Sequence, residues 1–410
     1  MTLKNKCSLI MEEMKKIWRP GIVLALLVLG FVYYTMFLEF YVDYFPNGAQ
    51  NAGILLAGKE LVQNYGTSIS AEEMSDFEKT LPALHKEADR SVRESELGKK
   101  YNLTTYEQYA AFCQEASREA SAQGTSADLN EAYADSMRLR SYLQGEETGN
   151  IEGRLYGASW MSEAYRAREA YGAGLEMDGE KTYSKQETAR IRSAFFGSSQ
   201  MWQNVLPFEV PQTMGAYAGY LLIFICLSIC MLLAPLLVHD RMSRMLPLQY
   251  STRSGRRIYN SQLAAALLTA FLVTTAELAA FGWLLLGHET AVFLPCRMYS
   301  FAVMQFCIPN WTYGTWCLAL AGLCYLTALG TAGIVFFLSR TCGNYIVMLL
   351  RVLPVAVVMA VASPKMMGDA FYFENVLYRM SGVPYIEGMC AGVVFAVGMG
   401  LCWIGKWKVK

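Results

Sequence analysis

The residues of this chain that are best placed to do chemistry lie inside long apolar runs. Glu277 falls about midway along the run Leu263–Leu286. A carboxylate inside a bilayer is costly, so it should face the interior of a helix bundle or a cavity and find a partner. Two interpretations stay open. Glu277 contacts a substrate or a proton on a translocation path, or it makes a structural hydrogen bond between helices.

Arg351 and Pro354 interrupt a later run, Tyr345–Ala362. Arg351 lies about two helical turns from one end of that run. Its long side chain either extends to the membrane interface or lies on a translocation path. Pro354 is expected to kink the helix, which is typical of moving gates and also of static spans.

Motifs for hydrolytic, metal or nucleic-acid chemistry are missing from the sequence. It contains no Walker A loop, no HExxH and no GxSxG. The three histidines, His85, His239 and His288, are far apart and have no ligand spacing. No basic tract with interleaved aromatics argues for nucleic acid. We therefore expect no enzyme activity, metal or cofactor in this chain, and another chain must supply the energy for any vectorial work.

Six apolar runs predict the elements that position these residues. A bilayer core of about 30 Å needs roughly 20 apolar residues in a helix. The runs are Gly21–Leu38, Ala216–Val238, Leu263–Leu286, Trp316–Leu338, Tyr345–Ala362 and Gly388–Ile404. A further stretch, Phe293–Ile308, is interrupted by Pro295 and Arg297 and predicts an interfacial or re-entrant piece. The fold class expected is an all-α membrane protein with six transmembrane helices.

The distribution of charge predicts the orientation of these spans. Lys and Arg concentrate on cytoplasmic flanks. Basic residues precede the first run, fill the loop 239–262 and follow the sixth run. We therefore expect both termini in the cytoplasm and residues 42–212 outside. Residues 1–20 are expected to form an interfacial amphipathic helix, with a disordered basic tail as the alternative.

The segment 42–212 is predicted to be a separate helical domain between the first span, 21–41, and the five spans of 213–410. It holds 26 acidic and 17 basic residues. Alternating strand patterns are nearly absent, and we expect five or six helices. Three Ser/Thr-x-x-Glu boxes predict helix starts, at Ser70 with Glu73, Thr104 with Glu107, and Ser184 with Glu187.

The loop between the second and third runs is the most informative segment. It is short and basic, yet it also contains apolar residues such as Met242 and Leu246. These side chains are expected to bury against a partner or the membrane surface. The alternative is an ordinary positively charged cytoplasmic loop with interfacial hydrophobic residues.

This loop resembles the cytoplasmic loop of ABC type-2 (export-type) permeases. In both, an acid ends the second span, here Asp240, and a short Leu-rich helix follows. A Tyr250-Ser251-Thr252 stretch and Arg256-Arg257 then lead into the third span. The order of parts is also similar, with an interfacial helix, a span, a large outer domain and five more spans. Arg253 departs from the pattern, because the family usually has proline there.

The resemblance implies a bacterial plasma-membrane permease that works with separate subunits. Two copies, or this chain and a paralogue, would pair with ABC ATPase subunits that bind ATP and Mg. The loop would be the coupling helix that docks on the ATPase. The residues carried over to that role are Asp240, Arg241, Arg244, Ser251, Arg256 and Arg257.

Two other functions stay open. The chain could be a non-transporting transmitter, coupled to an ATPase and acting through its outer domain. Known transmitters of that kind usually carry four spans, so six spans count against this interpretation. The chain could also be an intramembrane enzyme, against which the lack of a paired catalytic constellation argues. The substrate is not legible, because apolar spans carry little readable specificity.

Overall fold

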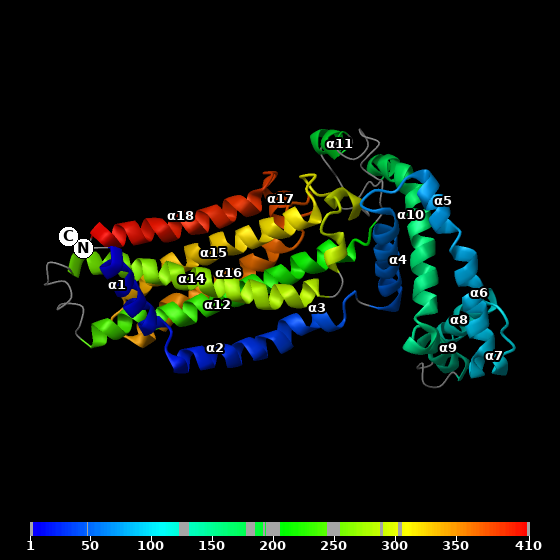
Figure 1. The fold of residues 1–410 in the computed structure, drawn as a ribbon, viewed down its shortest axis with the longest axis horizontal. Helices are drawn as coiled ribbons and strands as arrows, with labels where there is room; N and C mark the ends of the chain where they lie inside the picture. Colours follow the sequence, from blue (N-terminus) through cyan, green and yellow to red (C-terminus); the bar gives the residue numbers. More distant parts are fainter. Residues whose placement is uncertain are drawn as a thin grey trace. The chain divides into compact units, whose positions relative to one another are not determined.

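A computed structural model describes residues 3–46, 48–122, 131–177, 185–191, 193, 206–243, 255–287, 290–301 and 306–407. The chain forms two compact units (Figure 1). The first, called the bundle, comprises Met1–Asp43, Pro211–Ala291 and Gln305–Lys410. The second, called the inserted unit, comprises Tyr44–Val210 and Val292–Met304. No β-strand occurs in the described ranges, where Cys307 and Tyr372 form an isolated antiparallel bridge between two loops.

The bundle contains six helices that are long and apolar enough to cross a membrane. The first is composite, because α2 (Pro20–Tyr33) continues through a π-helical turn, η1 (Tyr34–Leu38), into α3 (Glu39–Asp43). The other five are α12 (Glu209–Met242), α14 (Gly255–Leu286), α15 (Tyr313–Thr341), α16 (Tyr345–Met367) and α18 (Ile386–Trp407). Each coincides with one predicted run and extends it. These six helices fit the predicted multi-pass, all-α membrane protein.

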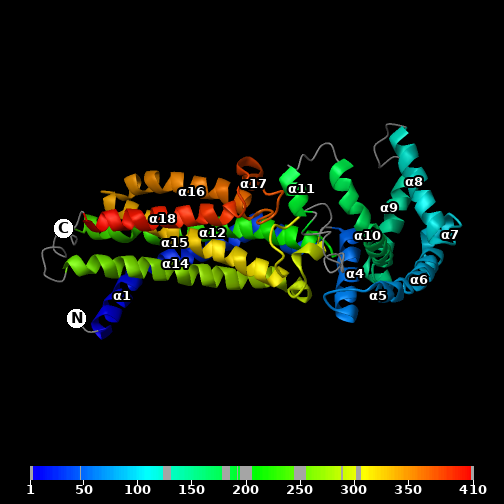
Figure 2. The same ribbon diagram turned by 90° about the horizontal axis from the view of Figure 1, so that it is seen from above.

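Glycines allow α15 and α18 to pack closely side by side (Figure 2). A Cβ atom built on Gly330 would lie 2.6 Å from the backbone nitrogen of Phe395, and one on Gly333 would lie 2.8 Å from the carbonyl carbon of Gly398. Such distances leave no room for a side chain. Small residues at a helix crossing are typical of membrane bundles, where van der Waals packing replaces the hydrophobic effect between helices.

Residues Leu3–Ile17 form α1, the helical one of the two alternatives considered for the N-terminal segment. Figure 1 shows α1 lying across the end of the bundle where the N and C termini lie. It packs against α14. Ile17 is fully buried, and the indole nitrogen of Trp18 donates to Thr269 Oγ1 at 3.3 Å. These contacts hold the amphipathic helix to the bundle.

The inserted unit contains eight α-helices in its described residues, more than the five or six expected. They are α4 (Ala49–Tyr65), α5 (Ala71–Glu78), α6 (Leu81–Glu94), α7 (Glu96–Lys100), α8 (Tyr106–Ala122), α9 (Glu131–Leu143), α10 (Ile151–Met177) and α11 (Lys185–Ile191). The long helix α10 contributes to two apolar clusters. It meets α4 and α5 around Leu61 and Met161. It meets α6, α8 and α9 around Val92 and Leu155.

The predicted helix starts were correct in one case and displaced in another. Ser70 and Glu73 form the complete capping box of α5. The second box lies one residue later than predicted, because the amide of Gln108 bonds to Thr105 Oγ1 and the side chain of Gln108 accepts from the amide of Thr104. Glu107 is therefore not the capping acid. The third box includes Ser184, which lies outside the described residues.

The piece predicted as interfacial or re-entrant, Phe293–Ile308, is divided between the two units, because Val292–Met304 belongs to the inserted unit and Gln305 begins the last part of the bundle. This segment, Val292–Met304, includes the short 3-10 helix η6 (Met298–Phe301). Phe293 and Cys296 are fully buried, and the amide of Leu206 donates to the carbonyl of Ser300 at 2.6 Å. The apolar residues of this run are thus buried within the protein. A short run broken by proline reads the same in sequence whether its partner is lipid or protein.

Candidate functional site

The end of the bundle that holds both chain termini, called the terminal end, contains the first predicted coupling residue. Asp240 lies near the end of α12 and is buried. Its carboxylate oxygen Oδ2 lies 3.3 Å from Lys16 Nζ, which also contacts Glu13 Oε1 at 2.9 Å. Lys16 and Glu13 belong to α1. The acid that begins the basic loop is therefore paired with the N-terminal helix.

Arg241, the next predicted coupling residue, binds the end of another span. Its guanidinium donates to the carbonyl of Cys342 at 3.2 Å and to the carbonyl of Arg340 at 2.6 Å. These carbonyls lie at the end of α15, where backbone acceptors have no partner within the helix. A cation is also favoured at the negative end of the helix dipole. Arg241 thus fastens the start of the loop to α15.

Three further contacts tie the remaining helices together at the terminal end. His239 Nδ1 lies 3.2 Å from the hydroxyl of Tyr345, which begins α16. The hydroxyl of Tyr259 on α14 donates to the carbonyl of Cys402 on α18 at 2.6 Å. The guanidinium of Arg340 lies 4.7 Å from the centre of the Tyr259 ring, within the range of a cation–π interaction. These contacts therefore link the ends of α12, α14, α15, α16 and α18 to one another.

The other predicted coupling residues are only partly within the described structure. Arg244 and Ser251 lie outside the described residues. Arg256 and Arg257 lie in the first turn of α14, and only their backbone is described. The terminal end thus brings Asp240 and Arg241 into one connected cluster. Sequence reasoning missed Lys16 as the partner of Asp240, because 224 residues separate the two.

Glu277, the predicted intramembrane residue, borders a cavity of about 480 Å³ on an open side of the bundle, where the lining residues Leu27, Phe31 and Ala280 are exposed. Three helical elements surround the cavity, namely the first span, α12 and α14. Apart from Glu277, the lining is apolar or aromatic. The other lining residues are Trp18, Val23, Leu26, Leu27, Gly30, Phe31, Tyr34, Phe224, Val273, Ala276, Ala280, Phe281 and Leu284.

The carboxylate of Glu277 is only 8% exposed, and its Oε2 atom has no hydrogen-bond partner in the described part of the chain. Ser228 on α12 is close enough to interact with the carboxyl of Glu277, although its hydroxyl makes no hydrogen bond of good geometry with any described residue. An ionised carboxylate in such surroundings is unfavourable unless a proton, a cation or a hydrogen-bond donor accompanies it. The carboxyl therefore lacks one polar or cationic partner, and a partner for Oε2 would have to displace the side chains that cover this atom.

Arg351 and Pro354 lie away from this cavity. Both are exposed on α16, which runs as one helix through Pro354. Arg351 Nη1 donates to Thr341 Oγ1, on the last residue of α15, at 3.1 Å. The guanidinium is thus directed toward the terminal end. The described lining of the Glu277 cavity includes no residue of α16, so the three predicted intramembrane residues do not form one site.

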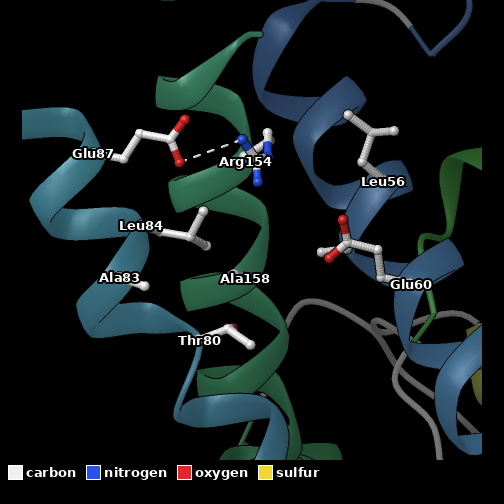
Figure 3. A pocket seen from close by; sticks show the side chains of 9 residues that line it. Leu56, Glu60, Thr80, Ala83, Leu84, Glu87, Arg154 and Ala158 are labelled. Carbon is white, nitrogen blue, oxygen red and sulfur yellow. Dashed lines mark ion pairs between the residues drawn. The ribbon is translucent and has the colours of Figure 1, made fainter. Parts of the chain in front are cut away.

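The inserted unit has a cleft of its own, of about 230 Å³, between α4, α6 and α10 (Figure 3). Arg154 on α10 lies 3.6 Å from Glu87 on α6. Figure 3 shows Glu60 on α4 across the cleft from this pair. No sequence motif indicated this cleft, because its charged residues come from three helices far apart in the chain.

No family model, no curated protein and no solved structure matches this chain. Within the described residues, no group of three or more His, Cys, Asp or Glu side chains could hold a metal ion. Three places in the described structure could therefore carry a function, namely the terminal end, the Glu277 cavity and the cleft of the inserted unit.

Proposed function

We propose that this chain is the membrane permease subunit of an ATP-binding-cassette exporter in a bacterial plasma membrane. In this proposal a separate ATPase subunit binds ATP and Mg and docks on the basic loop between α12 and α14. A second copy of the chain, or a paralogue, completes the translocation path. The observation that carries the proposal is the connected cluster of charged residues at the terminal end.

The cluster supplies what a coupling segment needs mechanically. A force applied to the loop enters α12 directly and reaches α15 through Arg241 and its two carbonyl contacts. It reaches α1 through the pair of Asp240 with Lys16. Because α1 packs against α14, the same force is delivered to the helix that carries Glu277. Packed helices transmit small displacements as rigid units, so docking at one end can alter the cavity farther along the bundle.

The distribution of charge supports the proposed orientation. Helix ends rich in basic residues meet at the terminal end, where Arg241 binds carbonyls at the end of α15, Arg340 lies over Tyr259 of α14, and Lys16 pairs with Asp240 of α12. Positive flanks are retained on the cytoplasmic side of bacterial membranes. We therefore place both termini and the basic loop in the cytoplasm, and the inserted unit outside.

The test is recovery of an ATPase with the intact chain. The tagged protein is purified from its native membranes in mild detergent, and co-purified proteins are identified by mass spectrometry. The same is done for the double variant Arg256→Glu with Arg257→Glu, and for the control Arg90→Glu with Arg93→Glu on the exposed surface of α6. The control changes the net charge by the same amount in the inserted unit.

Recovery of an ATPase with the native chain and the control, but not with the loop variant, supports both the permease role and the docking site. Recovery with all three proteins keeps the role and moves docking away from these arginines. If no ATPase accompanies the native chain in a preparation that retains other membrane complexes, the exporter proposal fails.

The cleft of the inserted unit favours a second candidate, a non-transporting transmitter that responds to a ligand outside the cell. Its charged walls, with Arg154 opposite Glu60, suit a small polar ligand that carries both signs of charge. The two functions differ in one readout. Stimulation of the partner ATPase by an external ligand, without net transport and lost in Arg154→Ala, would favour the transmitter.

A further inference from the structure

We propose that the Glu277 cavity binds a lipophilic cation, with its apolar body among the side chains of the first span and its positive charge at the Glu277 carboxylate. The inference deepens the exporter proposal by naming a ligand class. Its test needs neither an ATPase nor transport, because binding is measured on this chain alone.

The size and lining of the cavity define the apolar part of the ligand. Its volume of about 480 Å³ lies within the range of roughly 300–1,000 Å³ that is typical of small-molecule sites. Phe31, Phe224 and Phe281 contribute three aromatic rings to the walls. Aromatic faces attract organic cations as well as apolar groups. A compact ligand with aromatic or branched apolar substituents matches these walls.

The charge of the ligand follows from Glu277. It is the single charged residue in the described lining of the cavity. Its Oε2 atom is buried and has no partner among the described residues. A neutral lipid chain would fill the volume but leave that oxygen unpaired, and an anion would be repelled by the ionised carboxylate. A cation whose charge is surrounded by apolar groups can pair with the carboxylate without carrying water into the bundle.

The first span provides the route into the cavity from the lipid. The outer residues Leu24, Leu27, Val28 and Phe31 are all more than half exposed in the isolated chain. On the inner side, Gly30 packs directly against the ring of Phe224. The span therefore packs against α12 near its middle and exposes apolar side chains on its outer face. Leu27 and Phe31 belong both to this outer face and to the cavity wall, and Ala276 and Ala280 of that wall are also exposed, so the cavity is open to the lipid on this side.

Binding is expected to depend on pH through Glu277. Only the ionised carboxylate attracts a cation, so affinity should rise as the pH rises. The other ionisable side chains that face this region are Tyr34, in the cavity lining, and Cys226 on α12, near Glu277. Each of them is neutral when protonated. The variant Glu277→Gln keeps the shape of the side chain and removes the charge, which isolates the contribution of Glu277 from theirs.

The experiment measures equilibrium binding of tetraphenylphosphonium to the full chain in nanodiscs of a zwitterionic phosphatidylcholine, with protein-free nanodiscs as the background. Tetraphenylborate, which has a similar shape and the opposite charge, is the matched probe. We expect saturable binding of the cation only. Glu277→Gln should weaken it at least about tenfold and abolish its pH dependence, because it removes one partner of a desolvated charge pair. Glu39→Gln, at a carboxylate of the first span that is outside the cavity lining, should leave binding unchanged.

A second variant keeps the inference testable if Glu277→Gln fails to fold. Ala280→Phe keeps the carboxylate and fills the cavity, so it too should abolish saturable binding of the cation. Equal binding of both probes, or undiminished binding to the two cavity variants, would overturn the inference. The exporter proposal would stand or fall separately, on recovery of the ATPase.

Discussion

In the inserted unit the buried carboxylates of Asp135 and Glu152 each have several polar partners, whereas in the bundle one oxygen of Glu277 has none. The contrast is general. Every buried side-chain nitrogen or oxygen found without a hydrogen bond in the described ranges belongs to the bundle. Gln262 on α14, fully buried with neither amide atom bonded, is a second example.

The two units differ in whether their buried polar groups are satisfied within the unit. Folded proteins satisfy nearly all of their buried polar groups, because an unmade hydrogen bond costs about 1–3 kcal/mol. In its described residues, the inserted unit meets that condition with its own side chains. The bundle leaves several groups to be satisfied by something else, and a ligand, a water molecule or a second copy of the chain would serve. Variants in both units test this comparison.

The largest effect is expected where two backbones touch. Both units contain a glycine crossing, between α4 and α10 in the inserted unit and between α15 and α18 in the bundle. A Cβ atom on Gly53 would lie within 2.7 Å of the Cα of Gly153. Gly53→Ala should therefore destabilise the inserted unit by about 3 kcal/mol, although alanine is the better helix former. Hydrogen exchange of α4 and α10, followed by mass spectrometry, measures the effect.

The bundle offers the matched control for this change. Gly322 and Gly330 lie on the same helix, but a Cβ atom on Gly322 meets nothing within 4 Å. Gly330→Ala should lower protection in α15 and α18, and Gly322→Ala should not. If Gly53→Ala left hydrogen exchange in the inserted unit unchanged, that result would contradict the close packing of α4 against α10.

A smaller loss is expected from Asp135→Asn, which removes the best-paired carboxylate of the inserted unit. Asp135 lies 2.6 Å from Lys100 Nζ and 3.0 Å from the hydroxyl of Tyr101. The hydrogen bond from Lys100 lowers the pKa of Asp135 below its ordinary value. The substitution would keep the shape of the side chain and remove its charge, at a cost of about 2 kcal/mol in the free energy of unfolding. Exchange of α7 and α9 at neutral pH measures it.

The sign of the pH dependence tests the same carboxylate. Since the folded-state pKa of Asp135 is lowered, its contribution is present above the ordinary pKa of about 4 and is lost as the pH falls through the lowered value. The native chain should therefore lose protection in α9 on acidification more steeply than Asp135→Asn. Parallel pH profiles for the two proteins would contradict the pairing.

Glu152 should show a weaker dependence of the opposite sign. Its burial raises the pKa above the ordinary value, although Arg140, Gln144 and Tyr109 oppose the shift. A carboxyl with a raised folded-state pKa contributes stability that is present at low pH and lost as the pH rises through that value. In Glu152→Gln this loss should disappear. Protection of α10 measured across the acidic range, with the native chain as reference, decides the sign.

The smallest effect is expected at the terminal end, where the ion pair of Lys16 with Asp240 is partly open to solvent. Lys16→Ala should release α1 from the bundle by no more than about 1 kcal/mol. Lys15→Ala is the matched control, because Lys15 pairs only with the exposed Glu12. Faster exchange of α1 in the first variant and not in the second would support the junction. Equal exchange in both would remove Lys16 from it.

The sequence predicted the membrane helices well because their signal is local. A run of apolar residues long enough to cross a bilayer needs no partner to be recognised, and all six predicted runs are helices of the bundle. The capping box at Ser70 was correct for the same reason, since its two hydrogen bonds join residues three positions apart. The box near Thr104 was displaced because Gln108 competes with Glu107 for the same backbone amides.

The site was predictable only in its separate parts. The sequence indicated Asp240 and Arg241 as coupling residues and Glu277 as an intramembrane carboxylate. It did not indicate that Lys16 would reach Asp240 or that Arg241 would bind the end of α15. It predicted Phe293–Ile308 as one interfacial or re-entrant piece, and did not indicate that Val292–Met304 would belong to the inserted unit and the residues from Gln305 onward to the bundle.

Composition over a short window of sequence is thus enough to predict six apolar helices and the all-helical class. The same holds for the division of charge between the two parts of the chain. Only the tertiary structure decided which side chains share a site. Phe31, Phe224 and Glu277 line one cavity although about two hundred residues separate the first of them from the second. The physical reason is that a cavity and an unpaired carboxylate are properties of what surrounds a residue in space, and the chain order of an all-helical bundle leaves those neighbours unspecified.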